Sequence, residues 1–257
     1  MSIRDTGAEL RRLHDSPELL VVVNVWDVAS AAVVAGLDAT RALATASHSI
    51  AASHGYADGE NIPLDMHLAM IERIVASTDL PVSADLEAGY GNPAETVRKA
   101  IGVGVVGANI EDAMVPLDDA LRRVAEAVGA AEAEGIPFSL NARTDALLDT
   151  SGRDPDASLA EAIARGRAYL DAGATCVFVP GARDAATIGR LVEGIGERRV
   201  SVIGSPGAPP VSELATLGVA RVSYGPFTQR VALGALRDAA AQIYAGGGLP
   251  DRSLPLS

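Results

Sequence analysis

Two carboxylates lie close together in the stretch 81–92, which reads PVSADLEAGYGN. Asp85 and Glu87 are two residues apart, so in an extended backbone their side chains point to the same side. Two acids on one side repel each other unless a proton or a cation lies between them. Oxygen ligands beside a turn open to water suit Mg²⁺ or Mn²⁺. The pair therefore indicates a divalent-metal site, although an isolated D-x-E is more often two exposed loop acids.

Other polar residues follow apolar runs of strand length in the same way. They are Trp26-Asp27, Ser47-His48, Asn109 with Glu111, and Arg143 with Asp145. Later strand ends carry little ionisable chemistry: Pro180, Ser205-Pro206 and Ser223-Tyr224. Several acids and one arginine at a common edge need a cation for charge balance. With Mg²⁺ they would form a site for a small anion that chelates the metal through two oxygens.

The elements that must position these residues alternate along the chain. Strands are expected at 19–25, 40–45, 80–84, 105–110, 137–142, 175–179, 199–203 and 219–223. Helices are expected at 3–14, 28–35, 64–77, 94–101, 117–134, 159–171, 185–195, 211–217 and 227–244, and a loop at 47–58. About eight strand–helix units with short connections predict an α/β fold, a (β/α)8 barrel of the TIM type, with chemistry at the carboxyl ends of the strands. A doubly wound open sheet is the main alternative, but no G-x-G-x-x-G follows the first strand.

Length and composition restrict the class of protein. The 257 residues fit a single barrel domain over 1–257, with an N-terminal helix within 1–16 and a tail at 246–257. The net charge of −12 argues against nucleic acid or an anionic membrane as a partner. The single cysteine, Cys176, excludes an internal disulfide and, with no signal peptide or membrane-spanning run in the sequence, predicts a cytoplasmic protein. His14 and His67 are expected on helix surfaces.

Several of these stretches resemble the signatures of the isocitrate lyase/phosphoenolpyruvate mutase superfamily. They are NVWDVAS at 24–30, GYADG at 55–59, DLEAGYG at 85–91, NIED at 109–112, ARTDA at 142–146 and GVARVSYGP at 218–226. The matches occur in order at suitable spacing and extend over nearly the whole chain.

The resemblance implies a modified (β/α)8 barrel that binds Mg²⁺ or Mn²⁺ and a 2-oxo acid or its enolate. It places the direct metal ligand on Asp85 and water-mediated ligands on Asp58, Glu87 and Glu111. It places the substrate-clamping arginine on Arg143, and backbone groups for the substrate carboxylate at Ala46, Ser47 and His48. Trp26, Asp27 and Asn109 are further candidates for substrate binding, and Arg143, Glu111 and Asp58 are the candidates for catalysis. Members usually form homotetramers, as dimers of dimers that exchange the final helix, here 227–244.

The chain departs from the family after the fourth strand. Lyases carry a flexible K-[KR]-C-G-H loop there, and mutases and phosphonopyruvate hydrolases carry a loop with lysine and asparagine. Here residues 111–117, EDAMVPL, run straight into the next predicted helix. We therefore expect Mg²⁺-dependent carbon–carbon cleavage of a small 2-oxo or 2-hydroxy acid through an enolate, by a lyase or an oxaloacetate-type decarboxylase. A phosphonopyruvate-type mutase or hydrolase and a non-catalytic Mg²⁺/2-oxo-acid binding protein stay open. His48, Tyr90 and Tyr224 are candidate proton donors.

Overall fold

The strands form one curled, wholly parallel sheet. The computed structural model describes residues 2–148, 152–251 and 254. Within them the sheet has nine strands in the order β1-β9-β8-β7-β6-β5-β4-β3-β2. Their bounds are β1 Leu20–Val21, β2 Asn24–Val25, β3 Leu43–Thr45, β4 Val82–Asp85, β5 Gly107–Glu111, β6 Ser139–Arg143, β7 Cys176–Phe178, β8 Val200–Ile203 and β9 Arg221–Ser223. The alternation of parallel strands with helices confirms the predicted α/β fold.

The two ends of this strand order belong to one short segment, 20–25. On one side, the Val22 N–H donates to Val222 O over 3.0 Å, next to the pairing of β1 with β9. On the other side, the Ala44 N–H donates to Val23 O over 3.5 Å, next to the pairing of β2 with β3. The expected continuous strand at 19–25 is thus wrong in detail, because the segment changes partners half-way. This change of partners closes the sheet into a barrel.

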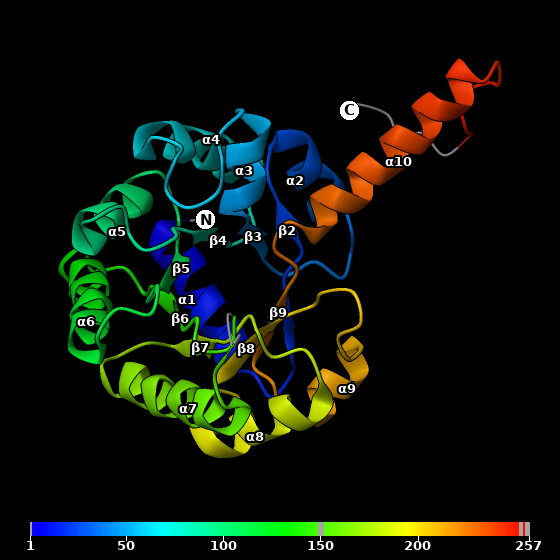
Figure 1. Ribbon diagram of the computed structural model, residues 1–257. Helices are drawn as coiled ribbons and strands as arrows, with labels where there is room; N and C mark the ends of the chain where they lie inside the picture. The colour runs from blue at the N-terminus through cyan, green and yellow to red at the C-terminus, as the bar shows by residue number, and fades with distance from the viewer. Residues whose placement is uncertain (1, 149–151, 252–253, 255–257) are drawn as a thin grey trace.

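Helices surround the sheet, as Figure 1 shows. Their bounds are α1 Ile3–Asp15, α2 Val28–Ala35, α3 Ser47–Ser53, α4 Leu64–Ala76, α5 Pro93–Gly102, α6 Leu117–Ala133, α7 Pro155–Asp171, α8 Ala185–Ile195, α9 Val211–Thr216 and α10 Phe227–Tyr244. The expected loop at 47–58 is partly wrong, because Ile50 and Ala51 are fully buried and hold α3 against the core. Helix α10 extends away from the barrel (Figure 1) and exposes Val231 and Leu236.

Helix α1 packs against the barrel under β5 and β6. Leu10 is fully buried, and a Cβ added at Gly107 on β5 would lie 2.7 Å from its Cδ2 atom. The bare Cα at Gly107 therefore allows α1 to pack closely under the sheet. His14 on the same helix is buried, with Nδ1 2.9 Å from Leu10 O, and burial lowers its pKa to about 3. His67 on α4 is also fully buried, so the expectation of surface histidines is wrong.

Candidate active site

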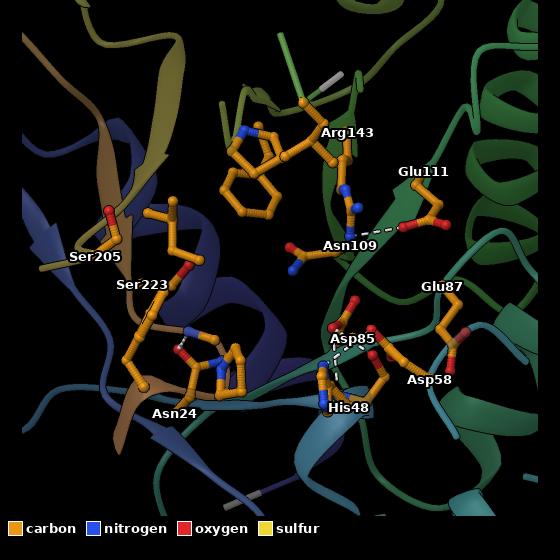
Figure 2. A pocket seen from close by; sticks show the side chains of 18 of the residues that line it. Asn24, His48, Asp58, Asp85, Glu87, Asn109, Glu111, Arg143, Ser205 and Ser223 are labelled. Atoms are coloured by element: carbon orange, nitrogen blue, oxygen red, sulfur yellow. Dashed lines mark hydrogen bonds and ion pairs between the residues drawn. The ribbon is translucent and has the colours of Figure 1, made fainter. Parts of the chain in front are cut away.

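A cavity of about 360 Å³ lies at the carboxyl ends of the strands. It brings together most of the predicted site residues: Ser47, His48, Asp58, Asp85, Glu87, Asn109, Glu111 and Arg143. Figure 2 shows Asp58, Asp85, Glu87 and Glu111 on one side of the cavity and Asn24, Ser205 and Ser223 on the other. The carboxylates are thus concentrated on one wall, which is where a cation would be stabilised.

Asp85 is the last residue of β4, and a serine at the start of α3 holds its carboxylate. Asp85 Oδ2 accepts hydrogen bonds from Ser47 Oγ over 2.8 Å and from the Ser47 N–H over 3.3 Å. The Asp85 N–H donates to Thr45 Oγ1 over 3.1 Å, which joins the ends of β3 and β4. Both bonds to the carboxylate go to Oδ2, so Oδ1 remains available for a ligand in the cavity.

Glu87 reaches the same wall by a different backbone path from the one that the spacing predicts. Strand β4 ends at Asp85, and Glu87 has a left-handed φ of 52°. The argument from extended backbone is therefore wrong, although both side chains do line the cavity. The Glu60 N–H donates to Glu87 Oε2, whereas Oε1 is buried without a hydrogen-bond partner among the described residues. Burial and the nearby carboxylates, Asp85 first, raise the pKa of Glu87 to about 7 against the lowering effect of the Glu60 N–H.

Arg143 at the end of β6 lies between two carboxylates. Its Nη1 atom is 2.6 Å from Glu111 Oε2, and its Nε donates to Asp145 Oδ1 over 2.7 Å. Strand register places Glu111 directly opposite Arg143. Burial disfavours the charge of Arg143, but Glu111 and Asp145 outweigh burial and raise its pKa. Burial raises the pKa of Glu111 to about 8, although Arg143 opposes that rise. The two ion pairs thus fix the orientation of the planar guanidinium at the cavity wall.

Asp58 and His48 form an exposed pair at the rim. His48 Nδ1 is 3.0 Å from Asp58 Oδ2, and the two side chains are 42% and 52% exposed. His48 is the one candidate proton donor that lines the cavity. Tyr90 and Tyr224 do not line the cavity, and the Tyr90 hydroxyl lies 3.0 Å from His67 Nδ1.

The donor set fits a hard divalent cation. Within residues 2–148, 152–251 and 254, no three His, Cys, Asp or Glu side chains converge closely enough to enclose a metal ion. Mg²⁺ does not need such a cage, because it usually keeps several waters and takes one or two carboxylates directly. The Oε1 atom of Glu87 is buried and has no partner among the described residues, and the pKa values of Glu87 and Glu111 are raised although Arg143 contacts Glu111, so the positive charge on this wall does not balance its carboxylates. Within the described residues, Asp85 Oδ1 and Glu87 Oε1 are carboxylate oxygens at this wall that accept no hydrogen bond from the protein.

Three predicted substrate-binding residues do not line this cavity. Asp27 caps α2 instead, because its Oδ1 atom accepts from the Ser30 N–H over 2.7 Å. Trp26 and Asp27 line a separate groove between α2 and α10. Ala46 is buried and lies outside the lining, directly before Ser47. The structure thus places Trp26, Asp27 and Ala46 outside this cavity; for Trp26 and Asp27 the reason is that the chain turns outward after Val25 to start α2.

The lining also includes polar and charged residues that were not among the predicted site residues, notably Asn24, Arg183 and Arg230. The Asn24 Nδ2 group donates to Thr45 O over 2.8 Å, and its Oδ1 accepts from the backbone N–H groups of Tyr224 and Gly225 over 2.6 and 2.9 Å. The sequence could have identified Asn24, since it is the first residue of the NVWDVAS stretch. The two arginines lie beyond their strand ends, where no local pattern identifies them.

Comparison with known proteins gives a match over most of the chain. A family model described as phosphoenolpyruvate phosphomutase matches residues 10–244. An uncharacterised protein of Mycobacterium tuberculosis is 32% identical over 246 residues, which are 95% of this chain and 91% of that protein. An oxaloacetate decarboxylase of Ectopseudomonas mendocina is 30% identical over 231 residues, 87% of this chain and 79% of that enzyme.

A solved structure agrees with these matches. A Burkholderia cenocepacia J2315 protein, provisionally assigned as a phosphonomutase, is 40% identical with a TM-score of 0.86 and covers 96% of this chain and 100% of its own.

Among the helices of the described residues, none combines the length and the apolar character that a membrane crossing needs.

Proposed function

The chain belongs to the isocitrate lyase/phosphoenolpyruvate mutase superfamily, and from this premise we propose that it is a Mg²⁺- or Mn²⁺-dependent carbon–carbon lyase. Its substrate in this proposal is a small 2-oxo or 2-hydroxy acid, and oxaloacetate-type decarboxylation is the preferred reaction. The observation that carries the proposal is the joint presence of Asp85 and the doubly held Arg143 at one cavity. The oxaloacetate decarboxylase among the relatives favours the same chemistry.

The residues of the cavity divide the work of such a reaction. Asp85 would hold the ion, with Asp58, Glu87 and Glu111 around it, and a bound ion would supply Lewis-acid polarisation of the substrate carbonyl. Arg143 would donate hydrogen bonds to the carbonyl oxygen, where negative charge develops as the carbon–carbon bond breaks. Phe178, Pro180 and Ile203 form an apolar part of the cavity wall that limits access of water to the enolate.

The short connection after β5 favours decarboxylation over retro-aldol cleavage. The chain passes from Glu111 to the start of α6 at Leu117 through a short turn, with no room for a long mobile loop. Retro-aldol cleavage needs a base for the departing alkoxide and an acid for the carbanion. Loss of CO2 leaves the bonding electron pair on the enolate, which then needs one proton at carbon. His48 is the cavity-lining side chain that could donate this proton.

Phosphorus–carbon chemistry on a phosphonopyruvate-like acid is the second candidate. It is favoured by the 40% identity with the protein provisionally assigned as a phosphonomutase. The same cavity would serve, because a phosphonate also has oxygens that bind a cation and Arg143.

We also propose a cytoplasmic homo-oligomer, a dimer of dimers in which copies associate through α10. The support is the exposed apolar surface of that helix, where Val231 is 74% and Leu236 is 65% exposed. Light scattering coupled to size exclusion tests this proposal, and a monomer at micromolar concentration would contradict it.

The test of the proposed reaction is release of pyruvate with Mg²⁺ from oxaloacetate, methylisocitrate, dimethylmalate and phosphonopyruvate, and release of glyoxylate from isocitrate. Asp85→Ala is measured beside the wild type, and Asp65→Ala, whose side chain is 87% exposed, serves as the matched control. We expect turnover of one acid that disappears in Asp85→Ala and persists in Asp65→Ala. Equal turnover in all three proteins would mean background metal chemistry and would refute the mechanism. No turnover, with Mg²⁺-dependent binding of oxalate, would favour a binding role.

A further inference from the structure

Asp112, directly after Glu111, is buried behind the cavity wall with 2% exposure. Its Oδ2 atom accepts from the Tyr169 hydroxyl over 2.7 Å and from Arg165 Nη1 over 3.2 Å. Its Oδ1 atom accepts from the backbone N–H groups of Met114 and Asp145 over 3.0 and 3.1 Å. Four hydrogen bonds, one of them from the buried Arg165 guanidinium, thus surround a carboxylate that does not line the cavity.

This carboxylate is linked to Arg143 by two routes. The backbone N–H of Asp112 donates to Arg143 O over 3.0 Å, and the Asp112 side chain holds the backbone of Asp145. The side chain of Asp145 in turn accepts from Arg143 Nε over 2.7 Å. The position of the guanidinium therefore depends on where Asp112 holds Asp145.

The turn after Asp112 is strained and is held by the same residues. Ala113 and Met114 have φ values of 46° and 54°, in the left-handed region that costs free energy for residues other than glycine. The Met114 N–H is bound by Asp112, and Arg165 Nη1 also donates to Val115 O over 3.0 Å. Such a backbone persists only where its surroundings determine it. Helix α7 supplies that support to the short connection between β5 and α6.

We propose that Asp112, Arg165 and Tyr169 are positioning residues for Arg143. Resting on the proposed function, the inference is that this buried network sets the orientation in which Arg143 meets the carboxylate or carbonyl oxygen of a 2-oxo acid. The same network holds the short connection between β5 and α6 in one conformation, at the position where lyases of the family carry a flexible loop. Arg165 is fixed from its other side by Glu161, whose Oε1 atom accepts from Arg165 Nε over 2.6 Å. The network thus joins α7 to the catalytic wall through the side chains of Arg165 and Tyr169, which contact the Asp112 side chain and the Val115 backbone.

Tyr169→Phe tests the proposal with little loss of volume, because it removes one hydroxyl and keeps the ring. Ile74→Val is the matched control, since Ile74 is fully buried in a separate apolar cluster with Val25, Leu43 and Val82. Mg²⁺-dependent oxalate binding is measured by calorimetry, thermal unfolding by fluorescence, and exchange of the Asp145 amide by hydrogen–deuterium NMR. Asp112→Asn is the stronger variant, and Tyr169→Phe keeps the test valid if Asp112→Asn does not fold.

We expect Tyr169→Phe to weaken oxalate binding by roughly tenfold, the lower end of the range for loss of a hydrogen bond to a charged group, with Mg²⁺ affinity unchanged. Exchange of the Asp145 amide should accelerate in the variant and stay at the wild-type rate in Ile74→Val. Oxalate affinity equal in the two variants at equal thermal stability would overturn the inference and leave a structural role. If the wild type binds no oxalate with Mg²⁺, the proposed function fails. Unchanged Asp145 exchange in Tyr169→Phe would then overturn this inference as well.

Discussion

Glu87→Gln should stabilise the metal-free protein at alkaline pH. Glu87 is 4% exposed, its Oε1 atom has no partner among the described residues, and Asp85 and Asp58 add negative charge around it. Glutamine keeps an oxygen that can accept from the Glu60 N–H, and its amide donors can face the neighbouring carboxylates. The substitution therefore removes an unfavourable charge while it preserves shape.

The raised pKa sets the magnitude of this effect. Burial first, and the neighbouring carboxylates after it, raise the pKa of Glu87 from 4.5 to about 7 in the folded protein. Because the folded pKa lies above the unfolded one, ionisation costs stability above pH 7, and this cost is lost as the pH falls towards 4.5. At 1.36 kcal/mol per pKa unit the cost at pH 8 is about 3 kcal/mol, or roughly 5–10 °C in Tm for a chain of this size.

The assay is thermal unfolding in EDTA and in Mg²⁺, at pH 8 and at pH 5.5. In EDTA the variant should melt above the wild type at pH 8 and by less than half that margin at pH 5.5. Mg²⁺ should raise the Tm of the wild type more than that of the variant, because the cation compensates a charge that the variant lacks. Glu72→Gln, on the exposed side of α4, should change neither result. A variant that melts below the wild type at pH 8 in EDTA would refute the argument from buried charge. An equal response to Mg²⁺ would remove Glu87 from the ion site.

Three further substitutions separate chemistry from structure. Arg143→Lys should lower kcat/KM by about 10²–10³, because lysine lacks the planar fork that Glu111 and Asp145 hold, and retained activity in steady-state kinetics would refute the clamp. Asp27→Ala should lower the free energy of unfolding by about 1 kcal/mol in urea titrations, as for a lost helix cap. A fall in kcat/KM of this variant would instead indicate that Asp27 takes part in the active site. Asn24→Ala should cost roughly 2–4 kcal/mol in the same titrations through three lost buried hydrogen bonds, and wild-type stability would contradict its role in joining β2, β3 and β9.

Local periodicity determines much of this fold. The predicted helix at 227–244 agrees with α10, Phe227–Tyr244, and the helix at 185–195 agrees with α8, Ala185–Ile195. Periodicity failed at 19–25 and at 47–58. In the first case an unbroken apolar run conceals a change of sheet partner, and in the second a run of small residues conceals a short buried helix. Both features depend on contacts with distant strands or the core.

The site was predictable only in part. Polar residues after strands identified Asp85, Glu111 and Arg143, because parallel strands in a barrel present their carboxyl ends at one edge. The same rule wrongly included Asp27 at the cavity, because a side chain next to a strand end can turn outward and cap a helix. Asp27 directly precedes the predicted helix at 28–35, the position where a capping aspartate is favoured, and the strand-end rule did not take this into account.

By itself the sequence determined the alternation of strands and helices, the strand ends that carry charge, and the superfamily resemblance. Tertiary structure alone decided which charged side chains face the cavity and what holds each of them. Tyr169 and Asp112 are 57 positions apart, and Asn24 reaches Tyr224 across 200 positions. The periodicity of apolar residues indicates only which face of a helix or strand is buried. The partner of a buried polar group is fixed when the barrel closes and removes water, so that each donor must find an acceptor in the protein.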